Sequence, residues 1–217
     1  MKTKFSFFII ALVAIISSLT VLGQEPTIEC PDGYTLKEAF LRYWIDEQNF
    51  CDITVYYCCK WDEANNQATF EIELMEETTV DGHCMDYIDD QTLNIWVRDQ
   101  ITTIADLACN PIPPDPDYVI EVIKIPSCMY WENKQVPPYG EDVYRLRKWS
   151  CNTNWCVYVY HISYDYRYNP PKLIRTLVNS YEEGTYICPT TKPEIPPPGK
   201  TMDEYWITDC FKIPCEE

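Results

Sequence analysis

Twelve cysteines are the residues of this chain whose type and spacing most directly indicate chemistry. An even number of cysteines behind a secretory signal is typical of a disulfide framework formed in an oxidising compartment. Oxidation competes with thiolate ligation there, so we expect disulfides, with no metal and no cofactor. The twelve are Cys30, Cys51, Cys58, Cys59, Cys84, Cys109, Cys128, Cys151, Cys156, Cys188, Cys210 and Cys215.

The pairing of these cysteines is left open by the sequence. Six lie before and six after a Pro-rich segment at 111–117, and each set of six allows about 15 connectivities. Cys58 and Cys59 are neighbours, and neighbouring cysteines bridge each other only with strain. Either the first six are paired differently from the last six, or Cys58 and Cys59 form a vicinal bond, or one of them bonds another chain.

Catalytic signatures are weak in this chain. His83 and His161 are the two histidines, and they match no metal-ligand or triad spacing. Carboxylate pairs such as Glu71 with Glu73 could serve as the two catalytic groups of a glycosidase, but a chain with 34 acidic residues contains such pairs by chance. We therefore predict that the protein is not an enzyme. A small secreted hydrolase that depends on a carboxylate pair is the second alternative.

An acidic loop at 81–90 is the one candidate for a hard cation. Asp81, Asp86, Asp89 and Asp90 supply carboxylates of the kind that Ca²⁺ prefers, but their spacing does not match an EF-hand. Asp89 and Asp90 also suit the first turn of a helix, where acidic side chains are favourable. We predict no metal site, and whether the loop binds Ca²⁺ is left open.

Aromatic residues are the more informative feature, with 17 tyrosines and 7 tryptophans. Along a strand, alternation places about half of the tyrosines in a core. The other half would form an outer face that stacks on glycan rings or holds a peptide, although bulky filling of a small core is an equal alternative. The possible binding face consists of Tyr56, Tyr158, Tyr160, Tyr164 and Tyr166.

The N-terminus is typical of a secretory signal peptide. Lys2 and Lys4 precede an apolar run at 5–22 that ends in Val-Leu-Gly, so we predict cleavage after Gly23. An uncleaved membrane anchor is the alternative. Cleavage leaves 194 residues with a formal charge of −19 and no membrane insertion, and such a surface repels nucleic acid and anionic headgroups. The predicted location is secreted or extracellular, and in a bacterium the periplasm or cell surface.

An internal repeat indicates how the chain is organised. The stretch at 41–51 returns 105 residues later at 146–156, with Leu, Arg, Trp, Asn and Cys in register. The Pro-rich segment is a natural linker because proline favours extended backbone. The predicted divisions are a signal peptide at 1–23, a cysteine-rich module at 24–110, a linker at 111–117 and a second cysteine-rich module at 118–217.

Hydrophobic periodicity predicts the elements of each module. The first reads as a helix at 35–48, strands at 52–59 and 68–75 that form a hairpin, and a helix at 91–108. In the second strand of that hairpin, Glu71 and Glu73 alternate with apolar residues and are expected to face water.

The second module begins with an added strand at 118–125, which could join its own sheet, that of its neighbour, or that of another subunit. A short helix at 141–149, strands at 156–164 and 172–178, and a shortened helix at 201–209 follow. The predicted fold class is therefore α+β, with two tandem duplicated disulfide-rich modules, each roughly helix–β-hairpin–helix, after a signal peptide.

These features favour a secreted, non-catalytic structural or interaction protein, such as a subunit of an extracellular or cell-surface assembly. Its expected partner is another protein or a second copy of itself. A secreted glycan- or peptide-binding module that uses exposed strand aromatics is the first alternative. Nucleic acid is excluded as a partner by the charge.

Overall fold

The computed structural model describes residues 27–77, 84, 87–101, 109, 119–135, 143–151, 154–169 and 172–215. The predicted signal peptide and the predicted linker lie outside these residues, as do Asp81, His83 and Asp86 of the acidic loop. Within the described part of the chain, no helix is both long enough and apolar enough to cross a membrane.

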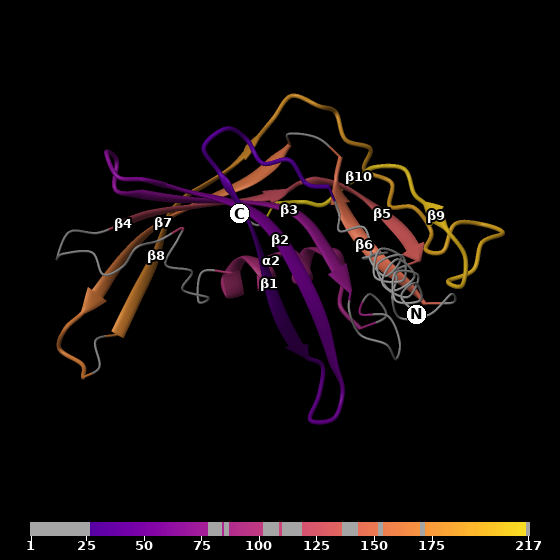
Figure 1. Ribbon diagram of the computed structural model, residues 1–217, viewed down its shortest axis with the longest axis horizontal. Helices are drawn as coiled ribbons and strands as arrows, with labels where there is room; N and C mark the ends of the chain where they lie inside the picture. Colours follow the sequence, from indigo (N-terminus) through magenta and orange to yellow (C-terminus); the bar gives the residue numbers. More distant parts are fainter. Residues whose placement is uncertain are drawn as a thin grey trace, which may run out of the picture.

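Ten strands and one helix are formed by the described residues, and all ten strands belong to one mixed sheet (Figure 1). The strands are β1 (Thr35–Trp44), β2 (Phe50–Asp62), β3 (Gln67–Glu77), β4 (Val119–Pro126), β5 (Cys128–Gln135), β6 (Tyr144–Ser150), β7 (Trp155–Asp165), β8 (Lys172–Glu183), β9 (Trp206–Ile207) and β10 (Phe211–Lys212). The helix is α2 (Asp90–Ile101). The order along the sheet is β10-β5-β6-β3-β4-β7-β8, with β2 and then β1 branching from β3, and β9 pairing with β5.

Strand β3 lies at the centre of this sheet. One edge pairs antiparallel with β2, and the other is shared between β4, which is parallel, and β6, which is antiparallel. Almost every residue of β3 is buried. The expectation that Glu71 and Glu73 face water is therefore wrong, because Glu71 is buried and Glu73 is half-buried. Both faces of β3 are covered, so its side chains are buried on both sides although apolar and acidic residues alternate in the sequence.

The predicted helix at 35–48 is also wrong. Residues 35–44 form β1, which pairs antiparallel with β2 along its whole length. Burial in β1 alternates every second residue, since Ala39 and Leu41 are buried while Phe40 is 72% exposed. Phe40 therefore lies on the solvent face of a strand, whereas an amphipathic helix over this segment would use its large apolar residues for packing.

In the second half, two further predicted helices are wrong. The segment at 141–149 overlaps β6, and the segment at 201–209 contains the short strand β9. Strand β6 pairs with β5 on one edge and with β3 on the other, so its position in the sheet is central. Short segments have ambiguous periodicity, and here pairing with distant strands decides the outcome.

The predicted strands are confirmed. The four hairpin strands are β2, β3, β7 and β8, and both hairpins are antiparallel. The added strand at 118–125 is β4, which pairs with β3 of the first half and with β7 of the second. It therefore joins the two halves inside one chain, and it is not an edge open to another subunit.

The predicted helix at 91–108 is confirmed over residues 91–101, and residues 102–108 lie outside the described residues. Leu93, Val97 and Ile101 are buried in the main apolar cluster, against residues of β1, β2, β4 and β7. With one helix and ten strands among the described residues, the predicted fold of two helix–hairpin–helix modules is replaced by one continuous mixed sheet.

All twelve cysteines form disulfides, which indicates an extracellular or otherwise oxidising environment. The six bonds are Cys30–Cys58, Cys51–Cys84, Cys59–Cys109, Cys128–Cys188, Cys151–Cys210 and Cys156–Cys215. Neighbouring Cys58 and Cys59 have different partners, so the first half is paired differently from the second. Every bond stays within its own half of the sequence.

Candidate functional site

Strand β8 is an exposed edge of the sheet. In the described part of the chain it pairs only with β7, and it ends the path of neighbouring strands. Figure 1 shows the β7–β8 hairpin extending away from α2 and from the rest of the sheet. The unpaired edge presents backbone donors and acceptors that another strand can meet.

The side chains of β8 are unusually apolar for such an edge. Pairing with β7 places Leu177 opposite the buried Tyr160 on one face, and Ile174 opposite Ser163 on the other. Packing a single face against the protein would therefore leave part of this apolar surface in water. Five apolar residues of β8 are between 39% and 47% exposed, namely Leu173, Ile174, Leu177, Val178 and Tyr181.

Charge is divided between the two ends of β8. Lys172 begins the strand, whereas Glu182 and Glu183 end it. Glu182 pairs with Lys212 at 2.8 Å, and Glu183 lies 3.5 Å from Lys124. Both glutamates stay 39% or more exposed in these contacts, so they remain available to a further cation. The free edge therefore has a basic start and an acidic end.

A β-bulge lies in the middle of β8. Leu177 is opposite Tyr160 and Asn179 is opposite Val159, so Val178 is the extra residue. A bulge bends the strand and increases its local twist, which is one way in which edge strands limit uncontrolled pairing. Any partner strand must therefore accommodate this bend.

The predicted tyrosine face is not assembled as expected. Tyr158 is 4% exposed and Tyr160 is 6% exposed, which corrects the expectation that they belong to an outer surface. The Arg98 guanidinium lies 4.7 Å from the Tyr158 ring centroid, and that of Arg175 lies 3.5 Å from the Tyr160 ring centroid. These tyrosines belong to the core, where α2 packs on the sheet.

The other three tyrosines of the predicted face do not form one surface. Tyr56 is half-buried on β2, where it pairs with Glu38 of β1. The ring centroids of Tyr164 and Tyr166 lie 6.2 Å apart at the C-terminal end of β7, and Tyr166 is 60% exposed. The structure thus brings Tyr164 and Tyr166 together and places Tyr56 on another strand.

A second candidate is the pocket beside the bulge of β3. Tyr56 pairs with Leu74 and Tyr57 with Ile72, so Glu73 is the extra residue of this strand. The pocket has a volume of about 480 Å³. Residues that line it include Glu29, Glu71, Glu73, Lys124, Trp155 and Glu183.

The two carboxyl groups of this pocket differ in environment. Glu71 lies 3.1 Å from the Lys124 ammonium. Burial, and then the charge of Glu71, raise the pKa of Glu73 to about 7. A carboxyl group that holds a proton near neutral pH beside an ionised one is the arrangement that acid–base hydrolysis uses.

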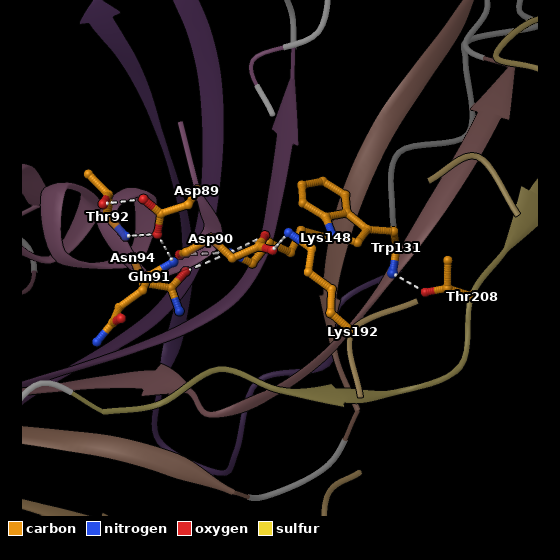
Figure 2. Close-up of polar contacts among 9 residues, drawn as sticks. All are labelled: Asp89, Asp90, Gln91, Thr92, Asn94, Trp131, Lys148, Lys192 and Thr208. Carbon is orange, nitrogen blue, oxygen red and sulfur yellow. Dashed lines mark hydrogen bonds and ion pairs between the residues drawn. The ribbon is translucent and has the colours of Figure 1, made fainter. Parts of the chain in front are cut away.

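A third site is a buried polar cluster where α2 meets β6. Lys148 is fully buried, and its Nζ atom donates a hydrogen bond of 2.7 Å to Asn94 Oδ1. The same atom lies 3.3 Å from Asp90 Oδ1, and Lys192 Nζ lies 2.5 Å from Asp90 Oδ2. Figure 2 shows Asp90 and Asn94 on one side of α2, pointing toward Lys148. The indole ring of Trp131 lies beside the Lys148 side chain, 5.7 Å from its Nζ atom.

Asp89 and Asp90 of the acidic loop have structural partners. Asp89 accepts a hydrogen bond from the Thr92 hydroxyl and, as an N-cap does, from the Thr92 and Gln91 amides, and these bonds lower the pKa of its carboxyl. Asp90 contacts Lys148 and Lys192. Within the described residues, these two carboxylates are thus committed to a helix cap and an ion pair.

Among the described residues, one group of potential metal ligands clusters in space, the sulfur atoms of Cys128, Cys151 and Cys210. All three are in disulfides, and an oxidised sulfur is not a thiolate ligand. Of the two histidines, His161 is partly exposed on β7, opposite Thr176.

Sequence reasoning missed the edge of β8 and the cluster around Lys148. The apolar run of β8 was visible in the sequence, but that no described strand pairs with its outer edge depends on the positions of β4 and β6 in the sheet. Lysine is usually exposed, and nothing near Lys148 in the sequence indicates burial. One signal was available, because Asp90 and Asn94 are four residues apart and must share a helix face.

Comparisons with protein-family models, with curated proteins and with solved structures find no match for this chain. Function is therefore argued from the geometry above.

Proposed function

We propose that this chain is a secreted, non-catalytic structural protein that associates with a second copy of itself through the free edge of β8. The observation that carries the proposal is the exposure of five apolar residues on both faces of an edge strand. In a continuous sheet such residues are covered by neighbouring strands and by the layers that pack on them. The six disulfides support an extracellular setting.

The charges of β8 favour a second copy as the partner. An antiparallel pair of β8 strands, centred between Leu177 and Val178, places Lys172 of each copy opposite Glu183 of the other. The same register places Ile174 opposite Tyr181. Two identical bulges then lie at the two-fold axis, so each strand meets a partner with the same bend. Opposite charges and apolar pairs both stabilise antiparallel strands.

The test exchanges charges across the proposed pair. We expect the mature protein to be a dimer by light scattering coupled to size exclusion, and Lys172→Glu or Glu183→Lys to shift it toward monomer. Each single variant places like charges opposite each other twice. An equimolar mixture of the two variants restores both ion pairs in a heterodimer, so dimer should return.

Lys200→Glu is the matched control, because it changes the charge equally in a loop outside β8. It should leave the dimer unchanged. Leu177→Lys, which puts a charge on the free edge, should give monomer. A wild-type protein that is monomeric at about 100 μM would contradict the proposal, since that concentration populates even a weak specific dimer. A dimer that survives every β8 substitution would mean that another surface is used.

A second candidate function is hydrolysis at the pocket beside Glu73. The observation that favours it is a carboxyl group with a raised pKa next to Glu71 and near Trp155, a side chain on which a sugar ring can stack. Glu71→Gln and Glu73→Gln should each abolish turnover of a panel of chromogenic glycosides. No turnover by the wild-type protein would remove this candidate.

A further inference from the structure

We propose that Lys148 and Asn94 form an intramolecular isopeptide bond, which covalently joins β6 to α2. The reacting groups are already in contact, since Lys148 Nζ lies 2.7 Å from Asn94 Oδ1, the oxygen bonded to the carbon that would be attacked. Asp90 is the third residue of the proposed site, and its Oδ1 atom lies 3.3 Å from the same Nζ atom. The proposal concerns a modification of this chain and is independent of the β8 edge.

Position and burial favour this reaction. Asp90 and Asn94 are one turn apart on α2, and both point at Lys148 in Figure 2. Lys148 is 0% exposed, Asn94 6% and Asp90 9%, so water does not compete for the amide carbon. A nucleophile and an electrophile held in contact react as though at very high concentration.

The protonation states also suit the reaction. Burial lowers the pKa of the Lys148 ammonium, although Asp90 opposes this, and the neutral amine is the nucleophile. Burial tends to raise the pKa of Asp90, but Lys148 and Lys192 lower it below its usual range. Asp90 is therefore an ionised base beside the amine that must lose a proton.

The step balances without any further reactant. The Lys148 Nζ lone pair attacks Cγ of the Asn94 amide, and a new carbon–nitrogen bond forms. Asp90 takes a proton from Nζ and passes it to the departing amide nitrogen, so the old carbon–nitrogen bond breaks and ammonia leaves. No oxidant or reductant is needed, and Asp90 returns to its ionised form.

The location of the bond gives it a distinct structural effect. All six disulfides lie within one half of the sequence or the other, and none joins the halves. Lys148 belongs to the second half and Asn94 to the first. An isopeptide bond here would be a covalent link between halves that are otherwise connected only by the main chain.

Mass spectrometry tests the proposal directly. Loss of ammonia lowers the mass by about 17 Da, but cyclisation of Gln24, the predicted first residue of the mature chain, has the same effect. The decisive measurement is therefore a tryptic digest of the reduced and alkylated mature protein. We expect a branched species that joins residues 61–98 to residues 148–167, because trypsin does not cleave after an acylated Lys148.

Variants assign the roles of the three residues. Asn94→Ala, Lys148→Arg and Asp90→Ala should each give the two peptides separately. Asn133→Ala, a matched control at another buried asparagine whose amide donates to two backbone carbonyls, should retain the branched species. Separate peptides from the folded wild-type protein would overturn the proposal. A branched species lighter by about 18 Da would also overturn it, since water is lost when Asp90 is the acylating group.

Discussion

Strands β3 and β8 are the second strands of the two repeated hairpins, but their environments are opposite. Val178 lies 104 residues after Leu74, one residue fewer than the 105-residue offset between the repeated stretches at 41–51 and 146–156, so the two positions correspond closely in the repeat. Leu74 is 0% exposed, whereas Val178 is 46% exposed. Both strands pair antiparallel with the first strand of their hairpin, and both contain a bulge. The difference therefore arises outside the hairpin.

The outer edge of each strand accounts for the difference. On β3 it is occupied by β4 and β6, whereas on β8 no described strand occupies it. Similar hairpins thus become the centre of the sheet or its end according to which other strands reach them. The proposed dimer would cover the apolar residues that β8 exposes.

The largest expected effect comes from truncating the two aligned positions. Leu74→Ala should lower the free energy of unfolding by about 2–5 kcal/mol, because it opens a cavity in a fully buried site. Val178→Ala should change it by less than about 0.5 kcal/mol in the monomer, because this residue is 46% exposed and its truncation opens no enclosed cavity. Urea unfolding with intact disulfides measures both.

Comparable losses of unfolding free energy for Leu74→Ala and Val178→Ala would contradict the difference between β3 and β8, because they would mean that β8 is already covered. A larger loss for Val178→Ala at high protein concentration than at low concentration would instead support association through β8.

A smaller effect should come from Arg175, the residue through which β8 contacts the core. Its guanidinium lies 2.8 Å from Glu121 Oε2 and stacks on the Tyr160 ring. Arg175→Ala leaves the buried Glu121 carboxylate without this partner, so we expect a loss of about 2–3 kcal/mol. Burial raises the pKa of Glu121 and Arg175 opposes this, so the loss should shrink in acid, where Glu121 is protonated.

Arg42→Ala is the matched control, because this arginine pairs with Asp52 on the surface, where 47% of the Arg42 side chain and 33% of the Asp52 side chain are exposed. It should leave the unfolding curve unchanged. Adding Glu121→Gln to Arg175→Ala should recover part of the loss. If it recovers nothing, the effect of Arg175 comes from packing on Tyr160 and not from charge.

The strands of both hairpins could be predicted because β-branched or aromatic residues recur there over seven or more positions. The segments at 35–48 and 141–149 could not, since both become strands through pairing in the sheet: the first forms a hairpin with β2, and the second pairs with β5 and with the distant β3. Phe40 shows the difficulty, because an exposed apolar side chain looks like a core residue whether the segment is analysed with helical or with strand periodicity. The spacing of apolar residues within one segment does not show which strand that segment will pair with.

The candidate sites were predictable to a smaller extent. The cysteines indicated disulfides, but their partners depend on the path of the chain through the sheet. Tyr158 and Tyr160 are buried because α2 places Arg98 against one of them and β8 places Arg175 against the other. The burial of Lys148 depends on β6 lying between two other strands. Each of these facts is set by tertiary structure.

The smallest effect, and the one that sharpens the comparison of the two bulges, is expected from Glu73→Gln. Burial and the charge of Glu71 raise the pKa of Glu73 from 4.5 to about 7. The native state therefore binds more protons than the unfolded state between these values, and stability falls as the pH rises through this window. Because Glu73 is only half-buried, we expect the variant to be more stable at pH 8 by on the order of 1 kcal/mol and unchanged at pH 4.

Glu38→Gln, an exposed carboxylate on β1, is the control for a change of net charge, and urea unfolding at both pH values measures the difference. An equal gain from both substitutions at pH 8 would mean that general charge repulsion is responsible and that the bulge of β3 has no special effect on its glutamate.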